Sequence, residues 1–294
     1  MNTVKLTEKE FEKLNKLDIR GAQNTESEIY VLDTWKYKNK NLLLKYLNEK
    51  EGEAFSSKLA TVSLMIDKKD EIKLDELVLP NNLVVINDEV VGFTVPYVRG
   101  ARTLTEVLND NKVSISNKIK YLKKIGKTLR KIEALKRKNI IDLTIGDLHE
   151  DNILITKDNN IKFIDLDGAY INNNYPQGAR YLYNEQLRYI KKYKYKNDLI
   201  CPNKTTDLYC YNMIIINMIA RSRMDSTNIP DYFNYTSYLI NLGFDKHLID
   251  SFRRIYSDGP NVNPEEYLER IDKEELSESS YNKYAEKVYG LKLF

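Results

Sequence analysis

The sequence predicts an α+β protein with most of its strands before residue 100 and most of its helices after it. The first part contains short apolar runs of strand length, separated by turn residues. The second part contains longer stretches in which apolar residues recur at helical spacing. One further pair of short apolar runs, at 153–155 and 161–164, interrupts the helical part. A chain of 294 residues with 42% apolar content can bury the core that such a fold needs.

Composition and charge narrow the class of protein. The net charge of +3 is small, so composition gives no argument for a nucleic-acid partner. The chain has two cysteines, Cys201 and Cys210, and no visible signal peptide, which predicts a cytoplasmic protein in a reducing compartment. The longest apolar run, at about 213–220, is too short to span a bilayer, so we expect no membrane partner.

The first expected strands lie at 17–22, 28–33 and 41–47. The loop that joins the first two, at 21–27, consists mostly of small or polar residues that favour turns. Lys45 interrupts the apolar third strand. A lysine in such a strand lies either at an exposed edge or beside an anionic partner.

A helix and a hairpin should follow these strands. Four apolar residues recur at helical spacing after residue 50: Phe55, Leu59, Val62 and Ile66. Segments at 79–86 and 90–98 then flank the turn residues 87–89, which is the pattern of two antiparallel strands.

Helices dominate the expected carboxy-terminal half. Thr103 and Glu106 have the spacing of a capping box at a helix start. An amphipathic pattern from 116 to about 138 predicts a long helix with a solvated, lysine-rich face. A second apolar helix should open near residue 205, with Asp207 in its first turn.

The residues with the clearest chemical meaning lie between these helices. Asp147 is followed five positions later by Asn152, and Asp165 comes thirteen positions after Asn152. A hairpin formed by 153–155 and 161–164 would bring Asn152 and Asp165 to the same end. Carboxylate and amide oxygens are hard ligands that suit Mg²⁺. The run therefore predicts a site for phosphoryl transfer from ATP, with one carboxylate left for the acceptor hydroxyl.

At these residues the chain resembles the protein kinase-like superfamily. Asp147 matches the catalytic-loop Asp of the family, Asn152 its metal-binding Asn, and Asp165 the Asp of its Asp-Phe-Gly motif. His149 stands where Ser/Thr kinases carry a lysine near the transferred phosphate, so we expect it to contact the nucleotide. The Asp-Leu-His run is similar to the loop of aminoglycoside phosphotransferases and choline kinases.

The resemblance implies further nucleotide contacts in the first half. Lys45 matches the lysine that contacts the α- and β-phosphates, and Gly21 and Asn24 lie in the expected phosphate loop. In the family a helix glutamate pairs with that lysine, and Glu53 is our candidate, with Glu51 as the alternative.

The resemblance also assigns the hinge and two more aspartates. Pro96 would offer its carbonyl, and Val98 its N–H, to the adenine. Asp167, in the run Asp-Leu-Asp-Gly, adds a second carboxylate near the metal or caps the following turn. Asp207 matches the Asp that anchors the catalytic-loop backbone in protein kinases, although a plain N-cap gives the same pattern.

Taken together, the resemblance implies a two-lobed protein kinase-like fold: a small antiparallel sheet lobe at 1–97 and a larger, mostly helical lobe at 98–294. We expect a Ser/Thr protein kinase that uses ATP and Mg²⁺ on a protein substrate. Two alternatives remain open. The Asp-Leu-His run and the missing Ala-Pro-Glu motif favour a small-molecule phosphotransferase. The third interpretation is a pseudokinase that binds a nucleotide or a partner without catalysis.

Overall fold

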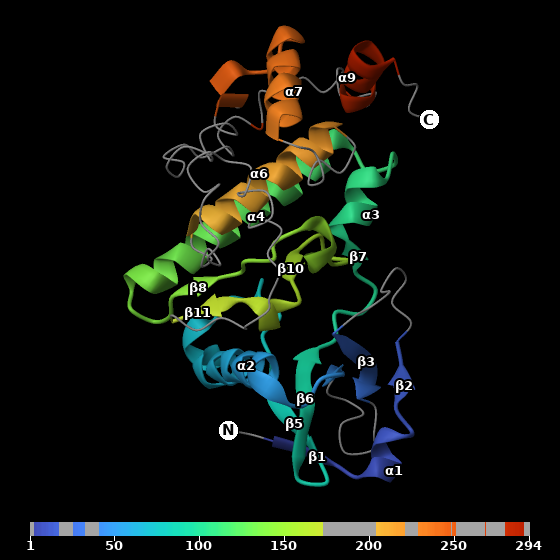
Figure 1. The fold of residues 1–294 in the computed structure, drawn as a ribbon, viewed down its shortest axis with the longest axis vertical. Coiled ribbons are helices and arrows are strands. Elements are labelled where there is room, and N and C mark those ends of the chain that lie inside the picture. The colour runs from blue at the N-terminus through green and yellow to red at the C-terminus, as the bar shows by residue number, and fades with distance from the viewer. Residues whose placement is uncertain are drawn as a thin grey trace.

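A computed structural model describes residues 3–17, 26–32, 41–172, 204–220, 229–247, 249–250, 268 and 280–290. It is a mixed α+β structure, as the sequence predicts. Figure 1 shows the largest sheet towards one end of the molecule and helices α7 (Ile229–Asn241) and α9 (Ser280–Tyr289) at the other. Within the described residues, no helix combines the length and the apolar composition needed to cross a membrane.

The largest sheet has six strands in the order β1-β5-β6-β4-β3-β2. Their bounds are β1 (Thr3–Leu6), β2 (Asn15–Lys16), β3 (Ser27–Leu32), β4 (Leu42–Leu47), β5 (Asn82–Ile86) and β6 (Glu89–Pro96). The sheet is mixed, because β1 runs parallel to β5 while the other neighbours are antiparallel. The sheet is thus mostly antiparallel, as expected, and the one parallel pair comes from a strand at 3–6 that we did not expect.

The hairpin between β5 and β6 follows the turn chemistry of the sequence. Asn87 and Asp88 have φ angles of 51° and 63°. Positive φ at both central residues is typical of the type I′ turn, and Asn and Asp tolerate this conformation better than most residues do. The turn therefore forms where the sequence predicts it.

Gly92 allows β4 and β6 to approach closely beside Lys45. A Cβ atom at Gly92 would lie 2.1 Å from the backbone oxygen of Lys45. The oxygen belongs to the sheet backbone and the Cβ would be bonded directly to it, so neither atom could rotate away from the clash. The absence of a side chain at Gly92 thus allows the backbones of β4 and β6 to lie this close at Lys45.

Helix α2 (Gly52–Ile72) belongs to two hydrophobic cores at once. Its Val62 packs with Leu47 and Phe93 of the sheet. Its Met65 and Ile72 pack in the larger core of the helical half. In Figure 1 this helix lies between the sheet and the other helices. The two halves of the chain are therefore joined through shared apolar contacts, and not only through the connection near residue 97.

The helical half is built on α4 (Ile115–Arg137) and α6 (Lys204–Ala220). Ser114 caps α4 by accepting from the Asn117 N–H at 3.3 Å. The Tyr211 hydroxyl of α6 donates to the Leu122 carbonyl of α4 at 3.0 Å. The predicted capping box also forms, at the start of the short α3 (Leu104–Asn109).

Small sheets carry the segments between these helices. β9 (Ile153–Ile155) lies between β10 (Ile161–Phe163) and β7 (Arg102–Thr103), and β8 (Leu143–Thr144) pairs with β11 (Tyr170–Ile171). Phe163 of β10 also bonds to the segment after α2: its N–H donates to the Glu76 carbonyl at 2.7 Å, and its carbonyl accepts from Val78 at 2.9 Å. These bonds place the β9–β10 hairpin against the end of α2.

We expect Gly92→Ala to lower the free energy of unfolding by about 1–3 kcal/mol, because the added methyl group meets a backbone oxygen. Chemical denaturation measures this. Gly168→Ala is the control, since a Cβ there has no neighbour within 4 Å. Equal stability of the Gly92→Ala variant and the unmodified protein would contradict the packing argument.

Candidate functional site

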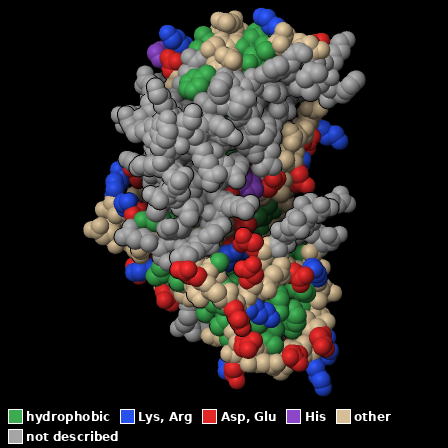
Figure 2. Space-filling view, in the orientation of Figure 1, with side chains coloured by type: hydrophobic (Ala, Val, Ile, Leu, Met, Phe, Trp, Pro, Cys, Tyr) green, Lys and Arg blue, Asp and Glu red, His purple; other side chains and the backbone are tan. Residues whose placement is uncertain are grey.

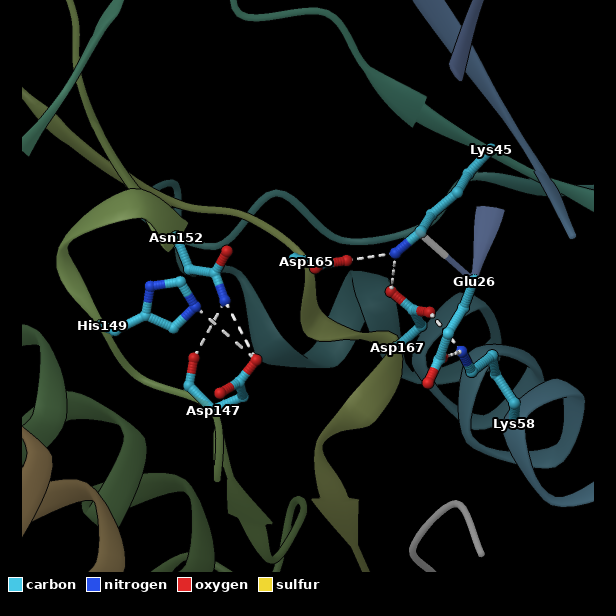
Figure 3. Close-up of polar contacts among 8 residues, drawn as sticks. All are labelled: Glu26, Lys45, Lys58, Asp147, His149, Asn152, Asp165 and Asp167. Carbon is cyan, nitrogen blue, oxygen red and sulfur yellow. Dashed lines mark hydrogen bonds and ion pairs between the residues drawn. The ribbon is translucent and has the colours of Figure 1, made fainter. Parts of the chain in front are cut away.

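The β9–β10 hairpin brings Asn152 and Asp165 to one end, as the sequence predicts. The register pairs Ile153 with Phe163. One step further along, the Ile164 N–H donates to the Asn152 carbonyl at 2.9 Å. Figure 3 shows the side chains of Asn152 and Asp165 near each other, with Asp147 beside Asn152.

Asn152 is oriented by Asp147. Its amide nitrogen donates to the Asp147 backbone carbonyl at 3.0 Å and lies 3.4 Å from the carboxylate oxygen Oδ2. These bonds distinguish the nitrogen of the amide from its oxygen. The amide oxygen points away from Asp147 (Figure 3), which leaves it in a suitable position for a cation.

Asp147 itself is open to solvent. Its side chain is 41% exposed, so the carboxylate can reach a molecule that enters from outside. The face drawn in Figure 2 is hollowed between the sheet part and the helical part, and acidic side chains and a histidine gather beside the hollow.

His149 lies in the same loop and faces Asp147. Its Nε2 is 3.7 Å from Asp147 Oδ2, and its Nδ1 accepts from the Asp151 N–H at 3.3 Å. Burial favours the neutral ring, but the hydrogen bond and charge of Asp147, with the charges of Asp151 and Glu150, outweigh it and raise the pKa of His149. The His149 ring therefore interacts with the Asp147 carboxylate. Contact between His149 and a nucleotide remains a prediction.

Lys45 contacts two aspartates that lie about 120 residues later in the chain. Its ammonium group pairs with Asp165 Oδ1 and lies 2.6 Å from Asp167 Oδ1. Burial opposes the charge of Lys45, but the two carboxylates outweigh it and raise the pKa of Lys45. Of the two positions that the sequence allowed for this lysine, the structure shows the one beside anionic partners.

A sharp turn places the two aspartates around Lys45. Asp165 has φ 59° and ψ 46°, a left-handed conformation that Asp adopts more readily than most residues. It ends β10 and starts the short 3₁₀ helix η2 (Leu166–Gly168), in which Asp167 is buried. Burial works against the charge of Asp167, yet Lys45 and Lys58 hold its pKa well below the ordinary value.

The helix residue that reaches this cluster is Lys58 of α2. Its ammonium nitrogen lies 3.5 Å from Asp167 Oδ2 and also pairs with Glu26. Glu53, the expected partner of Lys45, is an exposed residue in the first turn of α2. The described ion pairs of Lys45 go to Asp165 and Asp167.

Sequence reasoning missed Lys58, although a signal existed. Lys58 follows Phe55 by three positions and precedes Val62 by four, so it lies on the apolar face of the helix. A lysine on that face has to find a partner inside the structure.

Asp207 holds the backbone just before Asp147. Its two carboxylate oxygens accept from the Ile145 N–H and the Gly146 N–H, each at 2.9 Å. Burial raises the pKa of Asp207 to about 6, although these two N–H groups act in the opposite direction. The structure thus selects the anchor and not the plain N-cap. Further along α6, the Asn217 amide donates to Glu150 at 2.6 Å, so α6 supports the loop at two points.

The expected hinge lies at the end of β6. The Tyr97 N–H donates to the Asn41 carbonyl at 2.7 Å, so the polar groups of Tyr97 face β4. Backbone groups alternate in direction along a strand, so those of Pro96 face the other edge. On that edge, the pairing of β5 with β6 ends with Asn82 opposite Thr94, two residues before Pro96. The expected positions of Gly21 and Asn24, in the first phosphate loop, lie outside the described residues.

The donor set suits a metal that takes few protein ligands. Among the described residues, no group of three or more His, Cys, Asp or Glu side chains is arranged to hold a metal ion. Mg²⁺ commonly keeps several waters and takes one or two carboxylates together with substrate phosphates. The oxygen atoms of Asn152 and Asp165 fit that requirement.

Comparisons with known proteins do not identify the chain. No protein-family model matches it, and no curated protein matches it. The functional interpretation therefore depends on the geometry of the site and on the motif at 147–168.

Asp207→Asn should change how stability depends on pH. A raised pKa means that the folded state binds a proton more tightly, so the stability from this group is present below about pH 4 and is lost as pH rises to about 6. The change amounts to about 3 kcal/mol, because each pKa unit corresponds to about 1.4 kcal/mol. We expect the stability of the Asn variant to lack this dependence on pH. The free energy of unfolding that the variant loses relative to the unmodified protein should therefore be largest near pH 4 and smaller at pH 7.

Urea unfolding at pH values from 4 to 8 measures the effect. The same series on Asp158→Asn, which alters an exposed residue of the hairpin turn, provides the control. A penalty for Asp207→Asn that does not vary with pH would contradict the assignment of the raised pKa to this residue.

Proposed function

We propose that the protein is an ATP- and Mg²⁺-dependent kinase that transfers the γ-phosphoryl group to a Ser or Thr hydroxyl of a protein, on a two-lobed kinase-like fold divided near residue 97. One observation carries the proposal: an exposed carboxylate, an oriented amide, a further carboxylate and a buried lysine converge from distant parts of the chain. The lysine comes from the sheet and the other three groups from the loops around the β9–β10 hairpin.

Asp147 is the catalytic residue in this proposal. Its carboxylate is accessible, and its backbone is held by Asn152 on one side and by the anchored Gly146 on the other. A carboxylate so placed can orient an acceptor hydroxyl and accept its proton. The His149 ring lies beside it, with Nε2 3.7 Å from one oxygen of the carboxylate.

Asn152 and Asp165 would hold Mg²⁺ in this proposal, and Asp167 is the further candidate from the sequence. The bound ion would supply charge neutralisation at the phosphates. The role of Lys45 follows from its charge, since an ammonium group kept protonated and preorganised can contact phosphate oxygens. Its present partners, Asp165 and Asp167, hold it at the place where the metal-binding oxygens lie.

The nucleotide base would bind at the end of β6. The Pro96 carbonyl points away from β4, and Val98 lies two residues further on, which is the spacing that one acceptor and one donor on an adenine require. Gly21 and Asn24 would approach the phosphates from the loop before β3. Val95, which packs with the group around Val62 and Phe93, would limit the depth of the pocket.

The second candidate function is a small-molecule phosphotransferase. The run Asp147-Leu148-His149 favours it, because this run is similar to the loop of aminoglycoside phosphotransferases and choline kinases. The chemistry at the phosphate is the same for both acceptors. A panel of acceptors distinguishes them: generic proteins and the chain itself on one side, and small alcohols and aminoglycosides on the other.

We expect Asp147→Asn to abolish transfer and to retain ATP binding, because the amide cannot accept a proton and Asp147 is not a proposed metal ligand. The loss should be about 10²–10⁴-fold, the usual contribution of a positioned general base. Single-turnover transfer with saturating Mg-ATP measures the rate, and calorimetry measures the affinity.

Asp158→Asn, the same change at an exposed turn, should behave like the unmodified protein. Full activity of Asp147→Asn would refute the catalytic role. Nucleotide binding without transfer to any acceptor, in the unmodified protein as well as in the variant, would favour a pseudokinase instead.

A further inference from the structure

Asp167 differs from the other carboxylates of the site in its surroundings. Its side chain is 4% exposed, whereas that of Asp165 is 46% exposed. Its Oδ1 lies 2.6 Å from the Lys45 ammonium nitrogen, and its Oδ2 lies 3.5 Å from that of Lys58. Each oxygen of this buried carboxylate therefore faces a different cation.

The two lysines come from different elements and would repel each other without Asp167. Lys45 extends from β4 and Lys58 from α2. The side chains are only 12% and 15% exposed, so water screens their charges weakly. Among the described ion pairs, Asp165 pairs with Lys45 and Glu26 pairs with Lys58. Asp167 is the carboxylate that both lysines share.

We propose that Asp167 is a positioning residue that holds Lys45 and Lys58 together, and that Lys58 provides the link between α2 and the site that we had expected from Glu53. The charges of this link are the reverse of those we had expected. Helix α2 contributes the cation of Lys58, which pairs with a loop carboxylate, whereas Glu53 would have contributed a carboxylate to pair with the strand lysine. The metal then belongs with Asn152 and Asp165. The effect on catalysis rests on the proposed function, whereas the ion-pair arrangement does not.

Lys58 also pairs with Glu26, which is 75% exposed and lies in the expected phosphate loop at 21–27. An ion pair with so exposed a partner contributes little stability. The stabilising contact that remains for Lys58 is the one with the buried Asp167.

The ion-pair arrangement is tested in the protein without nucleotide. We would measure the unfolding midpoints of Asp167→Asn, Lys58→Met and the double variant. Asp167→Asn should lower the midpoint, because it removes the one carboxylate that faces both lysines and leaves less to offset the repulsion between them. Lys58→Met should then lower the midpoint less in the Asp167→Asn background than on its own, since it removes that repulsion.

The control is Lys68→Met, a lysine of the same helix that pairs with Glu71. Its effect should add independently to that of Asp167→Asn. If the effects of Lys58→Met and Asp167→Asn were also additive in the double variant, the proposal that Lys58 and Asp167 form a shared ion pair would be overturned.

The role in catalysis is tested by the Mg²⁺ dependence of turnover at saturating ATP. Asp167→Asn should lower kcat about 10–100-fold, as loss of a residue that orients another does, and should leave the half-saturating Mg²⁺ concentration unchanged. Asp165→Asn should raise that concentration. The split between kcat and Mg²⁺ dependence distinguishes positioning from a merely structural role, which would change neither once the folded fraction is corrected for.

An equal rise in half-saturating Mg²⁺ for both variants would make Asp167 a metal ligand and overturn the proposal, as would an unchanged kcat. Absence of turnover and of nucleotide binding in the unmodified protein would reject the proposed function. In that case the unfolding measurements still decide whether Asp167 holds the two lysines.

Discussion

The ammonium group of Lys45 joins the two halves of the chain at one point. It extends from the sheet and contacts two carboxylates of the turn after β10, so strands formed early in the sequence are tied to a loop formed much later. Within the sheet, Gly92 allows β4 and β6 to lie close together beside Lys45, since a Cβ at Gly92 would meet the Lys45 backbone oxygen. A buried charge of this kind is tolerated only because its partners are also buried or held by the same turn.

The other side of the site depends on a different kind of contact. Asp207 of α6 accepts two backbone N–H groups just before Asp147, and Asn152 donates to the backbone of Asp147 just after them. These bonds fix main-chain atoms and leave the Asp147 side chain open to solvent. The loop is thus held through its backbone while its carboxylate stays accessible, which is the combination that the proposed catalytic base requires.

Local patterns in the sequence were enough to predict several parts of this arrangement. The β9–β10 hairpin, the turn at 87–88 and the long helix α4 all formed close to the expected bounds, because each is determined by residues near in sequence. Long-range choices were harder. The N-terminal strand β1 pairs with residues about 80 positions away and was not expected. Asp207 fitted a local cap equally well, and only its bonds to Ile145 and Gly146 distinguish the two roles. Lys58 was overlooked because its partner, Asp167, follows it by more than 100 positions.

Two buried aspartates show how the partners of a carboxylate determine its charge. Asp167 and Asp207 are both almost fully buried, and burial pushes the pKa of each upward. The described partners of Asp207 are backbone N–H dipoles, which offset part of that cost, and its pKa rises to about 6. Asp167 meets the full charges of Lys45 and Lys58, which exceed the cost and hold its pKa low. The Asp167 carboxylate therefore keeps its charge in acidic solution, whereas Asp207, beneath the loop that carries Asp147, loses its charge as the pH falls through about 6. As the pH falls, Asp207 is protonated before Asp167.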